Sequence, residues 1–121
     1  MRGARRRGTS LLAAVLVVAS CARRSPLLDP QPKALARAAP DSFVVTFETT
    51  RGRFDMIARR AWSPAGVDRF YYLARNGYYD GARFFRVVKG FVAQFGLAAD
   101  PAVTAVWRGR TIPDDSVRAS K

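Results

Sequence analysis

The 121-residue chain contains no histidine and a single cysteine, Cys21. Without imidazole there is no histidine general base, and one thiolate cannot by itself hold a structural zinc ion. The sequence also lacks the run of about twenty apolar residues that a membrane-spanning helix needs. These absences exclude histidine-based catalysis, argue against a metal site, and predict no spanning helix in the mature protein.

Acidic residues are also few, because 21 Lys and Arg stand against 9 Asp and Glu, for a net charge of +12. The excess is uneven: eight of the basic residues precede Asp41. From Asp41 onward the basic excess is modest and forms no cluster, so nucleic acid is not the predicted partner. The length and the ordinary hydrophobic content of 49% predict one small globular domain.

The N-terminus has the pattern of an export signal. Four arginines lie within residues 2–7, and an apolar segment of signal-peptide length follows at residues 11–18. The next residues, Val18 to Cys21, resemble the bacterial lipobox, in which the cysteine is lipidated and becomes the first mature residue. We therefore predict a lipoprotein signal peptide at residues 1–20 and a lipid anchor at Cys21, facing the periplasm. The alternative to lipidation is that Cys21 is a buried free cysteine. Ala22, which follows the cysteine, resembles the sorting signal of outer-membrane lipoproteins, so the outer membrane is the predicted location.

The segment after the cysteine is rich in proline and alanine. Residues 21–40 include Pro26, Pro30, Pro32 and Pro40. Proline removes a backbone donor and restricts its neighbours, which disfavours both helix and sheet pairing. Residues 21–40 are therefore predicted to be an extended tether, with the folded domain at residues 41–121.

The folded part begins with a predicted β-hairpin. Phe43, Val45 and Phe47 alternate with more polar neighbours, which is typical of a strand with one buried face. Arg51-Gly52 is predicted to form a two-residue loop before a return strand of the same kind.

The clearest helix signal follows this hairpin. Ser63 is a suitable N-cap, Pro64 suits the first helical position, and Gly77 suits the position just beyond the end. The spacing of the apolar residues between them predicts one core-facing side, which is formed by Val67, Phe70, Tyr71 and Ala74.

Residues 83–96 hold two short runs of β-branched and aromatic residues around Lys89-Gly90, which predicts two strands joined by a tight turn. Arg86 and Gln94 interrupt these apolar runs. If both point to the same side as Phe91, they form an apolar surface with two hydrogen-bonding groups, suited to an extended peptide. The alternative on composition alone is that both are ordinary solvent-facing strand positions.

A family resemblance rests on this same stretch. Residues 84–96 read Phe-Phe-Arg-Val-Val-Lys-Gly-Phe-Val-Ala-Gln-Phe-Gly. This resembles the cyclophilin signature of peptidyl-prolyl cis-trans isomerases, roughly Phe-His-Arg-Val-Ile-x-Gly-Phe-Met-x-Gln-Gly-Gly. Residues 49–52 and 76–81, with Phe70 and Leu73, are also similar to the family, so the resemblance covers about residues 43–96.

The resemblance implies a mainly β fold with one or two helices, built as an antiparallel β-barrel. A complete domain of this family continues beyond the length present here, so we expect the N-terminal portion of an incomplete barrel. Residues 97–110 are expected to be an irregular loop around Trp107. Residues 111–115 resemble a proline-acidic segment found midway through the family.

The resemblance also implies the chemistry, which is rotation about X-Pro bonds without a nucleophile, metal or cofactor. Arg86 would be the catalytic donor to the prolyl nitrogen. Phe91 would form the floor of the proline pocket, beside Val92, and Gln94 would hydrogen-bond the substrate backbone. Proline-containing polypeptides, as exported folding clients, are the expected partners of a monomeric enzyme. Residues of the opposite pocket wall have no counterpart, so impaired activity is expected.

Four departures from the signature leave a second function open. Phe85 replaces a His, Lys89 a common Pro, Val92 a Met, and Phe95 a Gly where backbone is expected to pass close. Val92 and Phe95 leave room for a non-catalytic envelope lipoprotein that binds Pro-containing segments. The retained arginine and glutamine of the signature favour the enzyme, and a degenerate fragment without function is a third possibility.

Overall fold

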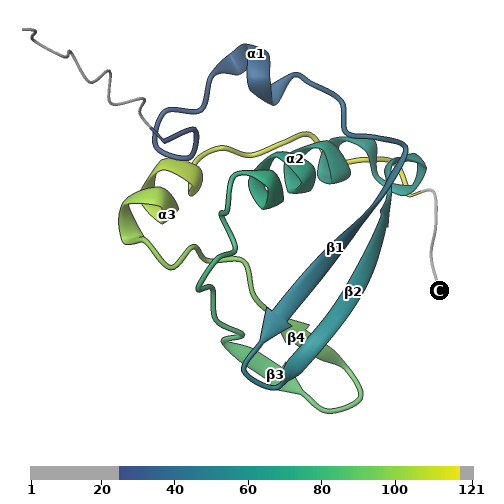
Figure 1. The fold of residues 1–121 in the computed structure, drawn as a ribbon. Helices are drawn as coiled ribbons and strands as arrows, with labels where there is room; N and C mark the ends of the chain where they lie inside the picture. Colours follow the sequence, from purple (N-terminus) through teal and green to yellow (C-terminus); the bar gives the residue numbers. More distant parts are fainter. Residues whose placement is uncertain (1–24, 118–121) are drawn as a thin grey trace, which may run out of the picture.

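The computed structural model describes residues 25–117, which form two antiparallel hairpins and three α-helices (Figure 1). In chain order the elements are α1 (Pro32–Leu35), β1 (Ser42–Thr49), β2 (Gly52–Arg59), a 3-10 turn (Arg60–Trp62), α2 (Pro64–Arg75), β3 (Arg86–Val88), β4 (Val92–Gln94) and α3 (Pro101–Trp107). Each hairpin is a separate two-stranded sheet, and the described residues form no closed barrel. This agrees with the predicted incomplete antiparallel barrel, although the α-helices number three rather than one or two.

The first hairpin confirms the predicted alternation. Along β1, Phe43, Val45 and Phe47 are half-buried while the residues between them are exposed. The predicted Arg51-Gly52 loop is wrong, because Thr49 pairs with Gly52 and the loop is residues 50 and 51. The error moves the register by two residues, which leaves every side chain on its predicted face since strands repeat every two residues.

Helix α2 begins where the sequence predicts, but its first turn is capped from far along the chain. The Ser63 hydroxyl does not accept from its own helix and instead donates to Asp115 at 2.6 Å. The Asp115 carboxylate also accepts the backbone N–H groups of Ala65 (3.0 Å) and Gly66 (2.9 Å). These are second- and third-position donors that an N-cap side chain ordinarily satisfies. A residue about fifty positions later therefore supplies the cap.

The end of α2 is fixed by a Schellman motif. Gly77 lies at φ 76°, a left-handed conformation that favours glycine. The Tyr78 N–H donates to the Leu73 carbonyl at 3.0 Å, and the Gly77 N–H donates to the Ala74 carbonyl at 3.2 Å. Leu73 and Tyr78 are both buried in the core, which joins the helix end to the hydrophobic cluster.

Helix α3 corrects the expectation of an irregular loop over residues 97–110. Pro101 occupies the first turn, and Asp100 accepts the Ala102 N–H at 2.8 Å as an N-cap. Val103 and Trp107, four residues apart, are the buried positions of the helix. Together with α2 they complete the core cluster, whose buried members are Leu27, Leu73, Tyr78, Val103 and Trp107.

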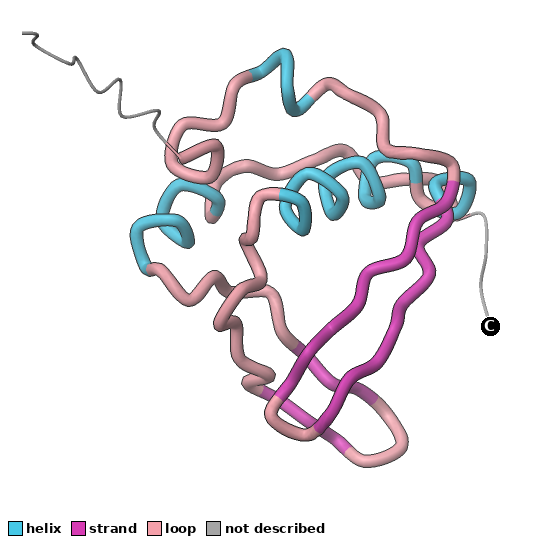
Figure 2. The backbone as a smooth tube through the Cα atoms, in the orientation of Figure 1, coloured by secondary structure: helices cyan, strands magenta, loops and turns pink. Residues whose placement is uncertain are grey.

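The segment before β1 is packed rather than extended. We call residues 25–40 the N-terminal strap; it runs past α2 and then enters β1 (Figure 2). Leu27 is 7% exposed, and its carbonyl accepts the Trp107 indole N–H at 2.8 Å. The Pro26 carbonyl accepts the Tyr72 hydroxyl at 2.9 Å.

The prediction that prolines keep this segment out of helices is wrong for Pro32, which stands at the first turn of α1. The missing N–H costs nothing at that position, because the first N–H groups of a helix have no partner within the helix. Residues 1–20 and Cys21 lie outside the described residues, so the signal peptide and lipidation stay predictions. Between residues 25 and 117, no helix is long and apolar enough to cross a bilayer.

An ion pair connects the first hairpin to α2 and the strap. The Arg60 guanidinium donates to both carboxylate oxygens of Asp68, at 2.7 and 3.0 Å. Asp68 also accepts the Ala39 N–H at 2.8 Å. The hydrogen bond from Arg60 is the main cause that holds the pKa of Asp68 below its ordinary value, against the opposing effect of burial. The carboxylate therefore favours the folded state when it is ionised.

We predict that Asp68→Asn lowers stability at neutral pH and reduces its dependence on acid. Because the pKa of Asp68 is lower in the folded chain, its stabilisation is complete above the unfolded pKa, about 4, and is lost as pH falls through the folded value. As the pH falls below about 5, the urea stability of the wild type should therefore decrease more steeply than that of the variant. Asp55→Asn on exposed β2 is the control, and identical pH profiles for the two variants would contradict the assignment.

Candidate active site

The β3–β4 hairpin places Arg86 directly opposite Gln94. The Arg86 Nη1 donates to the Gln94 Oε1 at 2.9 Å, so these two side chains lie on the same face. Gly90 turns the chain at φ 74°, and the Phe91 N–H donates to the Val88 carbonyl at 3.0 Å. The predicted strand–turn–strand is confirmed.

The Arg86–Gln94 contact leaves hydrogen-bonding capacity for a ligand. A guanidinium carries five N–H donors in one plane, and the contact with Gln94 engages one of its nitrogens. The Gln94 carboxamide uses its oxygen in this contact, and its NH₂ group carries two donors. Arg86 is exposed and Gln94 half-buried, so a peptide can reach a cationic donor beside an amide donor.

The two predicted apolar contacts lie on the same hairpin. Val92 is half-buried at the start of β4, where it pairs with Val88. Phe91 lies in the turn with 77% of its surface exposed. The structure thus shows Phe91 as an exposed ring, and its role as the floor of a proline pocket stays a prediction.

Phe95 is the site-supporting residue that the sequence analysis missed. Its ring packs against Phe47 on β1, Tyr79 and Phe84, with centroids 5.5, 5.6 and 5.1 Å apart. The sequence signal was present, since a large aromatic residue in place of a signature glycine needs partners of its own. Comparison with the signature alone marks Phe95 only as a departure.

The ring cluster behind the hairpin is uncharged. Burial, with a smaller effect of the neighbouring Tyr78, raises the pKa of Tyr79 to about 12. The Tyr79 phenol therefore stays protonated at neutral pH and places no anion behind Arg86. The polar side chains paired on the hairpin face are accordingly one guanidinium, Arg86, and one carboxamide, Gln94.

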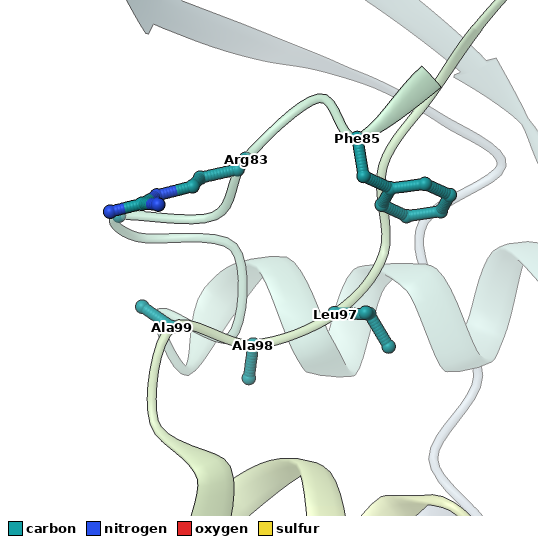
Figure 3. A pocket seen from close by; sticks show the side chains of 6 residues that line it. Arg83, Phe85, Leu97, Ala98 and Ala99 are labelled. Carbon is teal, nitrogen blue, oxygen red and sulfur yellow. The ribbon is translucent and has the colours of Figure 1, made fainter.

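A pocket of about 390 Å³ lies beside the hairpin and does not include the predicted site (Figure 3). It contains none of Arg86, Phe91, Val92 and Gln94. In Figure 3 the Arg83 guanidinium points away from the Phe85 ring and the Leu97 side chain. The lining residues are Gly81, Arg83, Phe85, Leu97, Ala98 and Ala99.

No metal centre is present in the part of the chain that the structure describes. Among residues 25–117, no three His, Cys, Asp or Glu side chains gather in a way that could hold an ion.

Comparisons with known proteins agree with the resemblance of residues 84–96 to the cyclophilin signature. Residues 44–120 match the family described as "Cyclophilin type peptidyl-prolyl cis-trans isomerase/CLD". The chain is 42% identical over 60 residues to peptidyl-prolyl cis-trans isomerase CYP18-2 of Arabidopsis thaliana, covering 50% of this chain and 35% of that protein. It is 39% identical over 51 residues to a peptidyl-prolyl cis-trans isomerase of Helicobacter pylori strain J99, covering 42% of this chain and 32% of that protein.

The match thus spans about a third of the length of these curated relatives. No solved structure gives a significant match to this chain.

The turn at Gly90 gives a direct test of the hairpin. A side chain at either Gly90 or Gly109 would meet no atom within 4 Å, but only Gly90 of the two has a positive φ. Gly90→Ala should therefore lower the free energy of unfolding by about 1 kcal/mol more than Gly109→Ala, because the left-handed conformation penalises a Cβ. Urea denaturation of both variants measures the difference. Equal losses would show that the turn is not formed as described.

Proposed function

This chain belongs to the cyclophilin-type family of peptidyl-prolyl cis-trans isomerases, and we propose that it catalyses rotation about X-Pro bonds at the β3–β4 hairpin. The observation that carries the proposal is the 2.9 Å contact between Arg86 Nη1 and Gln94 Oε1 at directly opposed strand positions. It supplies a cationic donor of fixed direction next to a backbone-binding amide. Proline-containing polypeptides are the proposed substrates.

The mechanism follows from how the X-Pro bond rotates. Conjugation gives the bond a barrier of about 18–20 kcal/mol, and it is lost when the bond twists. The prolyl nitrogen then gains a lone pair that can accept a hydrogen bond. Arg86 donates to that lone pair, so it stabilises the twisted state more than either planar state, as catalysis requires.

Gln94 and the apolar residues orient the substrate. The Gln94 NH₂ group donates to a substrate carbonyl, while its oxygen holds the Arg86 guanidinium in place. Phe91 and Val92 contact the proline ring. Holding the bond in one place before it twists removes part of the entropic cost.

Turnover is proposed to be slow in this chain. Phe91 is 77% exposed, so a proline ring placed on it would stay largely in contact with water. Burial of apolar surface contributes about 25 cal/mol per Å², and a one-sided contact gives only part of that. Weak proline binding, rather than a missing donor, is the proposed cause of impairment.

We predict that Arg86→Ala lowers kcat/KM for a proline peptide by at least tenfold, which is about 1.4 kcal/mol of transition-state stabilisation. A protease-coupled assay measures the rate of cis-to-trans conversion. Arg83→Ala is the matched control, because it removes a neighbouring arginine that lines the pocket outside the site.

Equal rates for Arg86→Ala and the wild type would rule out the role of Arg86. If the wild type binds the peptide without accelerating rotation, the enzyme proposal fails and a non-catalytic lipoprotein that binds Pro-containing segments replaces it. The departures from the signature at Val92 and Phe95 leave room for this second function.

We further propose that the protein is exported, lipidated at Cys21 and anchored in the outer membrane on its periplasmic side, where it assists folding of exported proteins. The arginine-rich start, the apolar segment and the lipobox-like residues 18–21 support this proposal. Multiple acyl chains anchor stably where one does not.

The N-terminal strap limits how far such an anchored domain can reach. Four residue steps separate Cys21 from Ser25, where the described structure begins, and they span at most about 14 Å. The strap is bound to α2 and α3 through Pro26 and Leu27, so it does not act as a spacer. The strap side of the folded domain is therefore proposed to lie close to the bilayer surface.

We predict that Cys21→Ser abolishes lipidation when the full chain is expressed in a Gram-negative host. The wild type should fractionate with membranes and carry the added mass of acyl chains, because Cys21 is the one thiol in the chain. Ser20→Ala, which keeps a small residue before the cysteine, should behave as the wild type. Mass spectrometry of the membrane fraction measures the acyl mass, and a wild type that carries none contradicts the proposal.

A further inference from the structure

The Arg86–Gln94 pair lies at the open end of its hairpin, opposite the Gly90 turn. Beyond this pair the Phe85 N–H donates to the Gln94 carbonyl at 3.0 Å. Phe84 precedes this end of β3 and Phe95 follows this end of β4, and their ring centroids are 5.1 Å apart. One ring pair therefore closes the hairpin directly next to the two polar side chains.

The hairpin alone has little to hold it in place. Each of its strands has three residues, and all three residues of β3 are exposed. Isolated two-stranded hairpins are marginally stable in water, so the position of such a short one depends on what it packs against. Side chains that connect it to other elements accordingly decide where Arg86 points.

Phe95 makes that connection. Its ring meets Phe47 on β1 at an interplanar angle of 78° and Tyr79 at 70°, both edge-on. Edge-to-face pairs of this kind contribute beyond simple burial of apolar area. Phe47 in turn stacks on Phe54 of β2, and Tyr79 packs on Phe70 of α2. A continuous set of rings thus runs from the first hairpin to the helix through Phe95.

We infer that Phe95 is a positioning residue, whose ring fixes the open end of the β3–β4 hairpin and thereby sets the direction of Arg86 and Gln94. The effect of Phe95 on catalysis rests on the proposed isomerase function, whereas its effect on the direction of the two side chains does not. Phe95 follows Gln94 directly in the chain, so movement of the ring turns the backbone that carries the amide. The residue that departs from the family signature is, in this chain, part of the support of the site.

The first test does not depend on activity. In ¹⁵N-labelled full chain, the Gln94 side-chain NH₂ signals report whether its oxygen is held by Arg86. Phe95→Ala should shift these signals towards those of the Arg86→Ala variant, and Phe95→Tyr should leave them as in the wild type. Trp62→Ala is the control, because that ring lies beside the Arg59 guanidinium and outside this set of rings.

The comparison is made at a temperature where circular dichroism shows each variant fully folded. Phe95→Leu, which keeps apolar bulk but loses the edge-on contacts, serves if Phe95→Ala does not fold. Unchanged Gln94 signals in the variant that folds, or equal shifts in Trp62→Ala, would overturn the positioning role.

The second test measures catalysis per folded molecule. Phe95→Ala should lower kcat/KM at least tenfold, and combining it with Arg86→Ala should cause little further loss, since both act on one donor. Full activity of folded Phe95→Ala would overturn the inference. If the wild type itself shows no isomerase activity, the proposed function fails, and the Gln94 signals still decide whether Phe95 positions the pair.

Discussion

The carboxylate of Asp68 holds three parts of the molecule together on the surface of α2. It accepts the Arg60 guanidinium at the end of the first hairpin and the Ala39 N–H at the end of the N-terminal strap. No described side chain is less than 2% exposed, so apolar burial alone gives this small fold little stability. Directional contacts to one helix therefore organise a chain whose core is thin. Other segments are also attached to α2. Tyr72 of α2 contacts the strap and Trp107 of α3, and Asp115 caps the first turn of α2 from the C-terminal segment.

The candidate site is built with a polar face and an aromatic support. Arg86 and Gln94 provide the donors, and the hydrogen bond between them orients the two side chains. Neutral Tyr79 and the Phe95 ring lie on the supporting side. This separation suits a reaction in which no bond is made or broken, because the protein has only to place dipoles around a twisting amide.

Local patterns predicted the local structure well. The alternation around Phe43, the start of α2 at Pro64 and the Gly90 turn are each encoded within a few residues, and each is confirmed. The opposition of Arg86 and Gln94 followed from the same turn.

The errors were partly local and partly due to contacts between distant segments. Prolines at residues 32 and 101 were interpreted as helix breakers or as parts of loops, yet each begins a helix where its missing N–H has no cost. Packing of the strap depends on Trp107, eighty residues away in the chain. The partners of Phe95 come from three separate segments, which no periodicity within residues 83–96 reveals.

The Asp115 cap also has a consequence for the order of folding. The first turn of α2 keeps unsatisfied N–H groups until a residue 50 positions later reaches it. Closing a loop of that length costs chain entropy that a local Ser63 cap would avoid. Contacts of such long range slow folding, so α2 can form early in synthesis but gains its full stability late. During synthesis from the N-terminus, α2 therefore gains its cap only when Asp115, which lies near the end of the described residues, has been made.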